Sequence, residues 1–274
     1  MNIDPNAREQ ARLQWNTTPC GRVEGDDHTL EYFLDIERER YAQQTWMHGI
    51  VPFGEYCGKN VLEVGCGHGT DLAQFGGHGA ECFAIDITER HLELTRRNFA
   101  LRGLRVDARE CDATAICFAN STFDCVYSFG VVHHIPEPAQ VLDEVHRVLK
   151  PGGAFFIGVY NKWSIFHVFS KLLAQGILRR DLFRIGYKGL LATIECGADG
   201  VNIKPYVKLY STRELLAMLG RAGFSVVRHG TVQLEPGHFS RLAGVAARHW
   251  DVFKKCEQRF GWYVWALAQK QGAV

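Results

Sequence analysis

The stretch that decides the fold reads Val61-Leu62-Glu63-Val64-Gly65-Cys66-Gly67-His68-Gly69. A short run typical of a strand leads directly into glycines at positions 65, 67 and 69. Because glycine has no side chain, the backbone can turn sharply there and approach a ligand closely. A helix expected to begin at Thr70 would add unpaired amide groups at the same place. The stretch therefore predicts a strand, a cofactor-binding turn and a helix.

The spacing of these glycines separates classes of cofactor. A nucleoside triphosphate loop needs GxxxxGK followed by Ser or Thr, whereas Gly69 is followed by Thr70-Asp71 with no lysine for the phosphates. The sequence excludes that class. A dinucleotide fold needs a third glycine or alanine at position 70, which is Thr70 here. A dinucleotide fits imperfectly and stays open as an alternative.

Acidic residues stand at the ends of the next two expected strands. The strand 81–85 ends at Asp86, which is placed to accept hydrogen bonds from ribose hydroxyls in either an adenosyl cofactor or a dinucleotide. The weaker strand 106–110 ends at Cys111-Asp112, where a carboxylate could accept a hydrogen bond from an adenine amino group. A ligand that stops at one nucleoside suits this pair, so the pattern favours an adenosyl cofactor.

Strand and helix patterns alternate from residue 60 onward, which is typical of a parallel sheet covered by helices on both faces. We therefore predict an α/β, Rossmann-like, doubly wound fold. The 274 residues are expected to form a single domain, 1–274. Its expected parts are an N-terminal lid (1–50), a cofactor-binding core (51–160), a helical cap insert (160–210) and a C-terminal helix with the last two strands (211–274).

Composition restricts the setting and the partners. The chain has 31 basic and 30 acidic residues, so no general attraction to nucleic acid or anionic membrane is expected. Nine scattered cysteines without a CxxC pair indicate reduced thiols and no structural metal. The polar start Met1–Gln14 resembles neither a secretory signal nor a transit peptide, and no apolar run is long enough to span a membrane. These features predict a cytoplasmic protein without stable membrane insertion, and they carry no signal of oligomeric state.

Several ordered motifs resemble the class I S-adenosylmethionine-dependent methyltransferases over about residues 58–160. Residues 63–69 match the family's ExGxGxG, Asp86 matches the acidic end of its second strand, and Asp112-Ala113 matches the adenine-side pair. The runs Val132-His133-His134-Ile135-Pro136 and Arg147-Val148-Leu149-Lys150-Pro151-Gly152-Gly153 resemble the ubiquinone/menaquinone C-methyltransferase-like branch. The resemblance implies a mostly parallel seven-stranded sheet with an antiparallel last strand.

The resemblance also implies S-adenosylmethionine as the cofactor and S-adenosylhomocysteine as its product. The positions that it assigns to cofactor binding are Glu63, Gly65, Cys66, Gly67, Gly69, Asp86, Ile87, Asp112, Ala113, Phe129 and Gly130.

Methyl transfer mainly requires alignment of a nucleophile behind the activated methyl group, so catalytic residues are expected to be few. His133 and His134 are the candidate general bases for a hydroxyl, phenol or acidic carbon. Packing beside the turn at Pro136 is the alternative role for both. Tyr32, in a helix that resembles the lid of related methyltransferases, and Tyr160 and Tyr206 are candidates for substrate binding.

The expected insert, residues 160–210, contains eight basic and three acidic residues among many apolar ones. This mixture indicates a cover for an apolar or aromatic small-molecule substrate, including one with an anionic group, or a surface that touches a membrane transiently. A solvated charged face over a core helix is the structural alternative.

Other functions remain as alternatives to methyl transfer to a small molecule. They are an NAD(P)-dependent oxidoreductase, a non-catalytic S-adenosylmethionine-binding protein and an aminopropyl transferase. Nucleic acid is not an expected acceptor, because Phe129-Gly130-Val131-Val132 follows where DNA methyltransferases carry Asn/Asp-Pro-Pro-Tyr. The sequence also lacks the paired-glutamate loop of protein arginine methyltransferases and a carboxylate cluster for magnesium.

Overall fold

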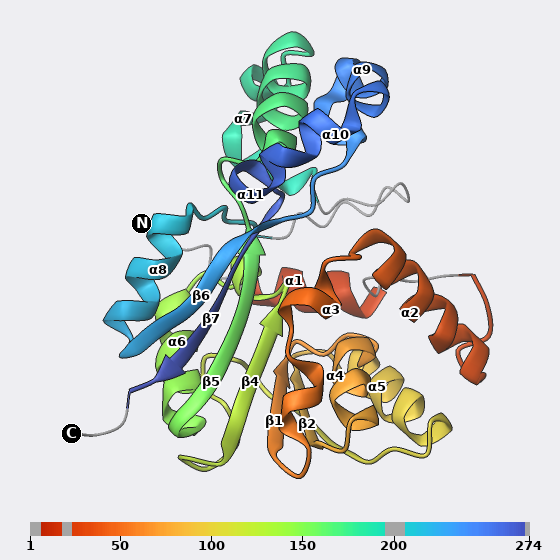
Figure 1. The fold of residues 1–274 in the computed structure, drawn as a ribbon, viewed down its shortest axis with the longest axis vertical. Helices are drawn as coiled ribbons and strands as arrows, with labels where there is room; N and C mark the ends of the chain where they lie inside the picture. The colour runs from red at the N-terminus through yellow and green to blue at the C-terminus, as the bar shows by residue number, and fades with distance from the viewer. Residues whose placement is uncertain (1–6, 18–23, 195–205, 272–274) are drawn as a thin grey trace.

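The computed structural model describes residues 7–17, 24–194 and 206–271 (Figure 1). One seven-stranded sheet with the order β3-β2-β1-β4-β5-β7-β6 forms the centre of the molecule. Strand β7 is antiparallel to both of its neighbours, and the other described pairs are parallel. This confirms the predicted sheet. The strands are β1 (Asn60–Val64), β2 (Glu81–Asp86), β3 (Val106–Glu110), β4 (Phe123–Phe129), β5 (Leu149–Tyr160), β6 (Phe224–Val232) and β7 (Tyr263–Lys270).

Helices connect these strands, and several more precede β1. The α-helices are α1 (Ala7–Thr17), α2 (Leu30–Gln43), α3 (Met47–Ile50), α4 (Thr70–Gly77), α5 (Glu89–Leu101), α6 (Pro138–Val148), α7 (Asp181–Ala192), α8 (Thr212–Arg221), α9 (Ala243–Arg248), α10 (Trp250–Phe253) and α11 (Glu257–Phe260). The 3₁₀ helices are η1 (Phe53–Tyr56), η2 (Val132–His134), η4 (Pro236–Leu242) and η5 (Lys254–Cys256), and η3 (Phe166–Leu178) is a π-helix.

Alternating side chains of the strands build a core on each face of the sheet. Leu62 of β1 packs in the cluster that includes Val141 of α6 and Leu215 of α8. Its neighbour Val61 packs in the cluster that includes Leu72 of α4 and Phe99 of α5. Successive strand residues point to opposite faces, so a continuous apolar strand such as β1 requires helices on both sides.

Two elements differ from what the sequence predicts. Lys150-Pro151-Gly152-Gly153 predicts a break before a strand over 154–159, but β5 already begins at Leu149. Phe123 pairs with Leu149 and Cys125 with Ala154, so residues 150–153 form an irregularity within the strand. The apolar pattern of residues 163–173 predicts a helix, and the corresponding element, η3, begins later and continues to Leu178. Residues 18–23, with Cys20, and 195–205, with Cys196 and Lys204 of the expected insert, lie outside the described residues.

A helical cap stands above the carboxyl end of β5 (Figure 1). It combines η3 and α7, from the predicted insert, with the segment from η4 to α11 between β6 and β7. The Ser170 hydroxyl donates to the His238 carbonyl at 2.9 Å across the two segments, and Phe169 lies against Phe239. The expectation of a cap from 160–210 alone is therefore incomplete, since β5 and β6 run in the same direction and end at one edge of the sheet.

The described cysteines, seven in number, are free thiols. None of the helices in the described part of the chain is both long and apolar enough to cross a bilayer.

Candidate functional site

The glycine turn has a backbone conformation that side chains disfavour. Gly65 has φ of +75°, and a Cβ atom there would lie 2.4 Å from the Val131 side chain. Gly67 has φ of +54°, and nothing lies within 4 Å of the place where its Cβ would stand. The first glycine therefore permits close packing of two loops, and the second leaves room for a ligand beside the backbone.

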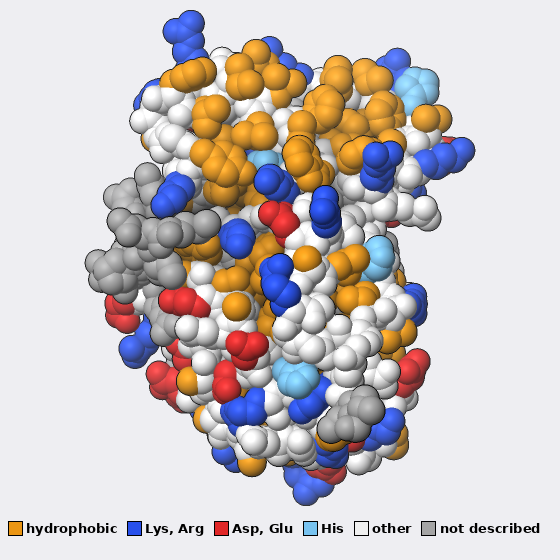
Figure 2. Space-filling view, turned by 90° about the vertical axis from the view of Figure 1, so that its left-hand side faces the viewer, with side chains coloured by type: hydrophobic (Ala, Val, Ile, Leu, Met, Phe, Trp, Pro, Cys, Tyr) orange, Lys and Arg blue, Asp and Glu red, His pale blue; other side chains and the backbone are white. Residues whose placement is uncertain are grey.

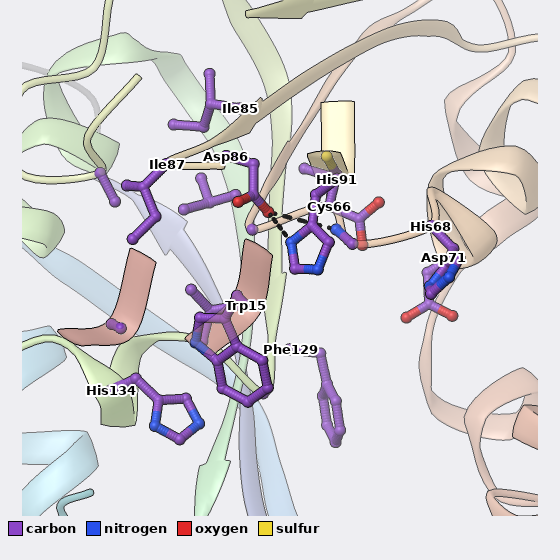
Figure 3. Close-up of a pocket in the computed structure, with 18 of the residues that line it drawn as sticks. Trp15, Cys66, His68, Asp71, Ile85, Asp86, Ile87, His91, Phe129 and His134 are labelled. Carbon is purple, nitrogen blue, oxygen red and sulfur yellow. Dashed lines mark hydrogen bonds and ion pairs between the residues drawn. The ribbon is translucent and has the colours of Figure 1, made fainter. Parts of the chain in front are cut away.

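A cavity of about 1020 Å³ opens beside this turn, at the carboxyl ends of β1, β2, β4 and β5 (Figure 3). Strand order reverses between β1 and β4, which is where ligands bind in open α/β sheets. Helices α1 and α2 cover the cavity from the N-terminal side. The predicted site residues that line it are Glu63, Gly65, Cys66, Gly67, Asp86, Ile87, Asp112, Ala113, Phe129, Gly130, His134 and Tyr160.

Asp86 at the end of β2 is held by several hydrogen bonds. Its Oδ1 accepts from the amide and the hydroxyl of Thr88 at 3.0 and 2.9 Å, and its Oδ2 lies 3.1 Å from His91 Nδ1. Burial alone would raise the pKa of Asp86. The positive charge and hydrogen bond of His91, together with the hydrogen bonds from Thr88, outweigh burial and lower the pKa below its ordinary value. The carboxylate is therefore ionised and oriented at the cavity wall.

His91 is a site residue that the sequence analysis missed. It lines the cavity, and its side chain is 6% exposed. Its Nε2 is buried and has no hydrogen-bond partner among the described residues. Buried polar atoms are normally paired, so this atom indicates a contact that a ligand would complete. Its position five residues after Asp86, in the first turn of α5, was the available sequence signal.

Asp112, the residue predicted for the adenine side, lines the cavity after β3. Its Oδ1 accepts from the amide and hydroxyl of Thr114 at 2.8 and 2.7 Å. These two bonds hold the carboxylate in a fixed orientation after β3, and Asp112 and Ala113 both line the cavity.

A buried ion pair closes the opposite side of the cavity. Arg40 of α2 donates from Nε to Asp71 Oδ1 at 2.7 Å and also bonds to Oδ2. The hydroxyls of Tyr41 and Tyr127 donate to the same carboxylate at 3.0 and 2.7 Å. Asp71 is 3% exposed, so these donors compensate its burial and fasten the lid helix to α4. Because two of its nitrogens bond to Asp71, Arg40 acts as a structural cation of the lid.

Glu63 lies behind the glycine turn, with Oε2 accepting from the Leu72 amide at 3.2 Å. Burial, and next the charge of Asp71, raise the pKa of Glu63 well above its usual value. The side chain therefore links β1 to α4 at the base of the cavity.

The two candidate bases have different surroundings. His134 lines the cavity, with Trp15 at its edge, and its Nδ1 lies 2.9 Å from the Tyr206 carbonyl. Since a carbonyl can only accept, Nδ1 carries the proton and the neutral ring has its lone pair on Nε2. His133 is fully buried against the Tyr160 ring, 3.8 Å between centroids, and does not line the cavity. The geometry thus favours His134 as the base and packing as the role of His133.

Burial, and then the nearby His134, lower the pKa of His133 well below its ordinary value. Folded protein therefore keeps this ring neutral, whereas unfolded chain protonates it below about pH 6.5. The stability contribution is present above that pH and is lost as the pH falls. We expect the free energy of unfolding of the wild type to fall relative to His133→Phe, by up to about 1.4 kcal/mol per pH unit, between pH 6.5 and 5. Urea unfolding at several pH values measures this difference, and identical slopes would contradict the packing role.

The remaining predicted site residues lie beside the cavity without lining it. Gly69 is the N-cap residue of α4, and a Cβ there would lie 2.9 Å from Thr95. The Tyr32 hydroxyl lies 3.4 Å from His68 Nε2, so Tyr32 supports a lining histidine. Tyr206 contributes its carbonyl to His134. Gln233, Trp262 and Tyr263 line the cavity but were missed, because they come from the distant C-terminal part of the chain.

Asp26, Asp27 and His28 bring possible metal-ligand atoms within 4.8 Å of one another. Asp27 already pairs with Arg90 and Arg97 of α5. The group therefore has a structural role, because it attaches the segment before α2 to α5.

Comparison with known proteins identifies the family. A family model described as a methyltransferase domain matches residues 62–157. A ubiquinone biosynthesis O-methyltransferase from Pseudomonas paraeruginosa is 33% identical over 123 residues, or 44% of this chain and 53% of that protein. The chain thus spans about half the length of this relative. A protein of the same name from Thiobacillus denitrificans is 32% identical over 169 residues, or 56% of this chain and 72% of that protein.

A solved structure shows the same fold. Magnesium protoporphyrin IX methyltransferase from Synechocystis PCC 6803, with bound S-adenosylhomocysteine, has a TM-score of 0.58 at 14% identity, covering 96% of this chain and 100% of that one. The family match and the sequence relatives favour methyl transfer over the nicotinamide alternative that the glycine spacing left open. Because the chain is 32% identical to the Thiobacillus denitrificans relative over 72% of that protein, it belongs to the class I S-adenosylmethionine-dependent methyltransferases, and its cofactor is S-adenosylmethionine.

Proposed function

We propose that this enzyme transfers the methyl group to a hydroxyl of an aromatic or otherwise apolar small molecule. The observation that carries the proposal is the aromatic wall that continues the cavity beyond Gly130. Tyr160 stacks on Trp262 with 4.2 Å between ring centroids, and Phe129 lies 4.5 Å from Tyr263. All of these rings line the cavity, and a flat apolar acceptor would pack well against them.

Residues at the other side of the cavity fit the cofactor. We assign the open space beside Gly67 to the methionine portion, Asp86 and His91 to the ribose, and Asp112 to the adenine; all four residues line the cavity. When bound, S-adenosylmethionine supplies an activated methyl group on a positively charged sulfur. The protein's part is to hold the acceptor in line behind that methyl group and to exclude water.

His134 is the proposed general base. With Nδ1 bonded to the Tyr206 carbonyl, its Nε2 can take the proton of an acceptor hydroxyl. This assignment supports oxygen as the methylated atom, as do the names of the curated relatives, which are O-methyltransferases. We also propose that Arg12 of α1, which lines the cavity, meets an anionic group of the acceptor in place of Glu9, from which it lies 3.9 Å away.

The test uses methyl-labelled S-adenosylmethionine, a metabolite extract and mass spectrometry of labelled products. We expect label on an aromatic or apolar small molecule, attached to oxygen. Label attached to carbon or nitrogen would contradict the proposed acceptor atom. Thermal stabilisation by S-adenosylhomocysteine provides an independent check that the protein used is folded and binds its cofactor.

Paired substitutions of His91 test its proposed contact with the cofactor. His91→Asn keeps a polar group near Nδ1, and His91→Gln reaches toward Nε2. If Nε2 makes a hydrogen bond with a ribose hydroxyl, His91→Asn should weaken S-adenosylhomocysteine binding by about fivefold, the effect of one hydrogen bond. His91→Gln should retain more of the affinity. Titration calorimetry gives both dissociation constants, and tighter binding by His91→Asn than by His91→Gln would exclude the contact.

A further inference from the structure

We propose that the helical cap docks this enzyme on an anionic lipid bilayer. This helical cap, called the basic cap below, comprises residues 163–194 and 236–260, which contain η3, α7 and the helices from η4 to α11. The proposal concerns where the enzyme is held and does not depend on the identity of its methyl acceptor.

Charge is divided unequally between the basic cap and the rest of the chain. The cap has ten Lys and Arg against three acidic residues, and the remaining sequence has 21 Lys and Arg against 27 acidic residues. A nearly neutral protein therefore carries a strongly positive end on an acidic body. Anionic headgroups would attract that end and orient the molecule with its cap toward the bilayer.

Exposed apolar side chains gather on the same part of the molecule. Of the fifteen large hydrophobic residues that are exposed in the described chain, eleven lie in the basic cap. On the face drawn in Figure 2, hydrophobic side chains spread over the upper end of the molecule, with Lys and Arg between and around them. An apolar surface of this kind is unusual for a face that contacts water alone.

The side chains where η3 ends and α7 begins suit contact with a membrane surface. Phe183 is 77% exposed and Leu178 is 57% exposed. Arg179 and Arg184 stand beside them and are also exposed. At a bilayer surface, the rings and aliphatic groups can enter the boundary below the headgroups while the guanidinium groups bond to phosphates. Since no described helix can span a bilayer, the cap would lie on the surface.

Charge distinguishes a bilayer from a second copy of the chain. Two basic caps placed face to face would bring together two strongly positive surfaces, and like charges oppose such contact. An anionic lipid bilayer provides both the opposite charge, in its headgroups, and an apolar layer beneath them. The observations therefore favour lipid over self-association.

The cap is also continuous with the cavity. Its first segment begins shortly after Tyr160, and its second lies between Gln233 and Trp262. These three residues line the cavity. A docked cap would hold the cavity close to the bilayer surface.

Vesicle co-sedimentation of the full chain tests the proposal. The vesicles are phosphatidylcholine alone, or phosphatidylcholine mixed with phosphatidylglycerol. We expect binding to the anionic vesicles, weaker binding to the neutral ones, and a decrease at high salt because salt screens the attraction.

Two cap variants and two matched controls separate charge from apolar contact. Arg179→Glu with Arg184→Glu should reduce partitioning onto anionic vesicles at least about 30-fold, since each basic residue near such a surface contributes about fivefold. Arg105→Glu with Arg221→Glu makes the same charge change on the exposed body and should retain most of the binding. Phe183→Asp should reduce binding roughly tenfold, whereas Val227→Asp, 58% exposed on β6, should retain it.

Stabilisation by S-adenosylhomocysteine, unchanged in all four variants, shows that each is folded. Absence of binding by the wild type to anionic vesicles would overturn the proposal. Equal losses in the cap and control variants would overturn it too. Concentration-dependent dimers that Phe183→Asp abolishes, without vesicle binding, would instead assign the surface to self-association.

Discussion

Arg40→Ala is expected to lower the free energy of unfolding by about 3–5 kcal/mol, because it leaves the buried Asp71 carboxylate without its cation. The tyrosine donors Tyr41 and Tyr127 would remain, but hydroxyl groups cannot neutralise the charge. The same change should loosen α2 from α4 and open the cavity. Chemical denaturation followed by circular dichroism measures the loss.

Arg38→Ala is the matched control for this prediction. Arg38 lies on the same helix and pairs with Glu31 and Asp35, but all three groups are exposed. Its removal should change stability little, since water and salt weaken exposed pairs. The double substitution Arg40→Met with Asp71→Leu should restore much of the lost stability, because neither buried charge then remains. Equal stability of Arg40→Ala and Arg38→Ala would contradict the role of the pair.

The second prediction with a large effect concerns Asp86. Asp86→Ala should weaken S-adenosylhomocysteine binding by about 10- to 150-fold, because one hydrogen bond to a charged group contributes about 1.5–3 kcal/mol. Asp86→Asn should also bind weakly, since the ionised carboxylate is lost while the side-chain shape is kept. Titration calorimetry measures both dissociation constants.

Asp107→Ala provides the comparison for the Asp86 variants. Asp107 lies on the neighbouring strand β3 and pairs with Arg109 away from the cavity lining. It should leave cofactor affinity unchanged. An unchanged dissociation constant for Asp86→Ala would remove Asp86 from the cofactor site.

Much of the cofactor side could be predicted because it depends on local sequence. A strand followed by glycines at positions 65 and 67 requires a turn, and acidic residues at the ends of parallel strands meet at one edge of the sheet. The cap, in contrast, was predicted from one segment. Its second segment, which includes Phe239, follows β6, far along the chain, and only the strand order brings it onto η3.

The residues of the candidate catalytic side show the same division. His133 and His134 are neighbours in sequence, and their pattern could not tell which one faces the cavity. The short helix η2 turns one ring under Tyr160 and the other toward Trp15. His91 was missed for a related reason. Its Nε2 becomes buried, without a hydrogen-bond partner among the described residues, only when α5 packs in the folded protein.

The sequence alone determined the order of strands and helices, the glycine turn and the class of cofactor, because each depends on residue types at short, fixed spacings. The tertiary structure decided which distant side chains meet: Arg40 with Asp71, Tyr160 with Trp262, and the two segments of the basic cap. Such contacts depend on burial and on the crossing of strands, and a linear pattern contains neither. Local chemistry therefore predicted the methyl donor's site, whereas packing formed the lid, the aromatic wall and the surface that we propose meets the bilayer.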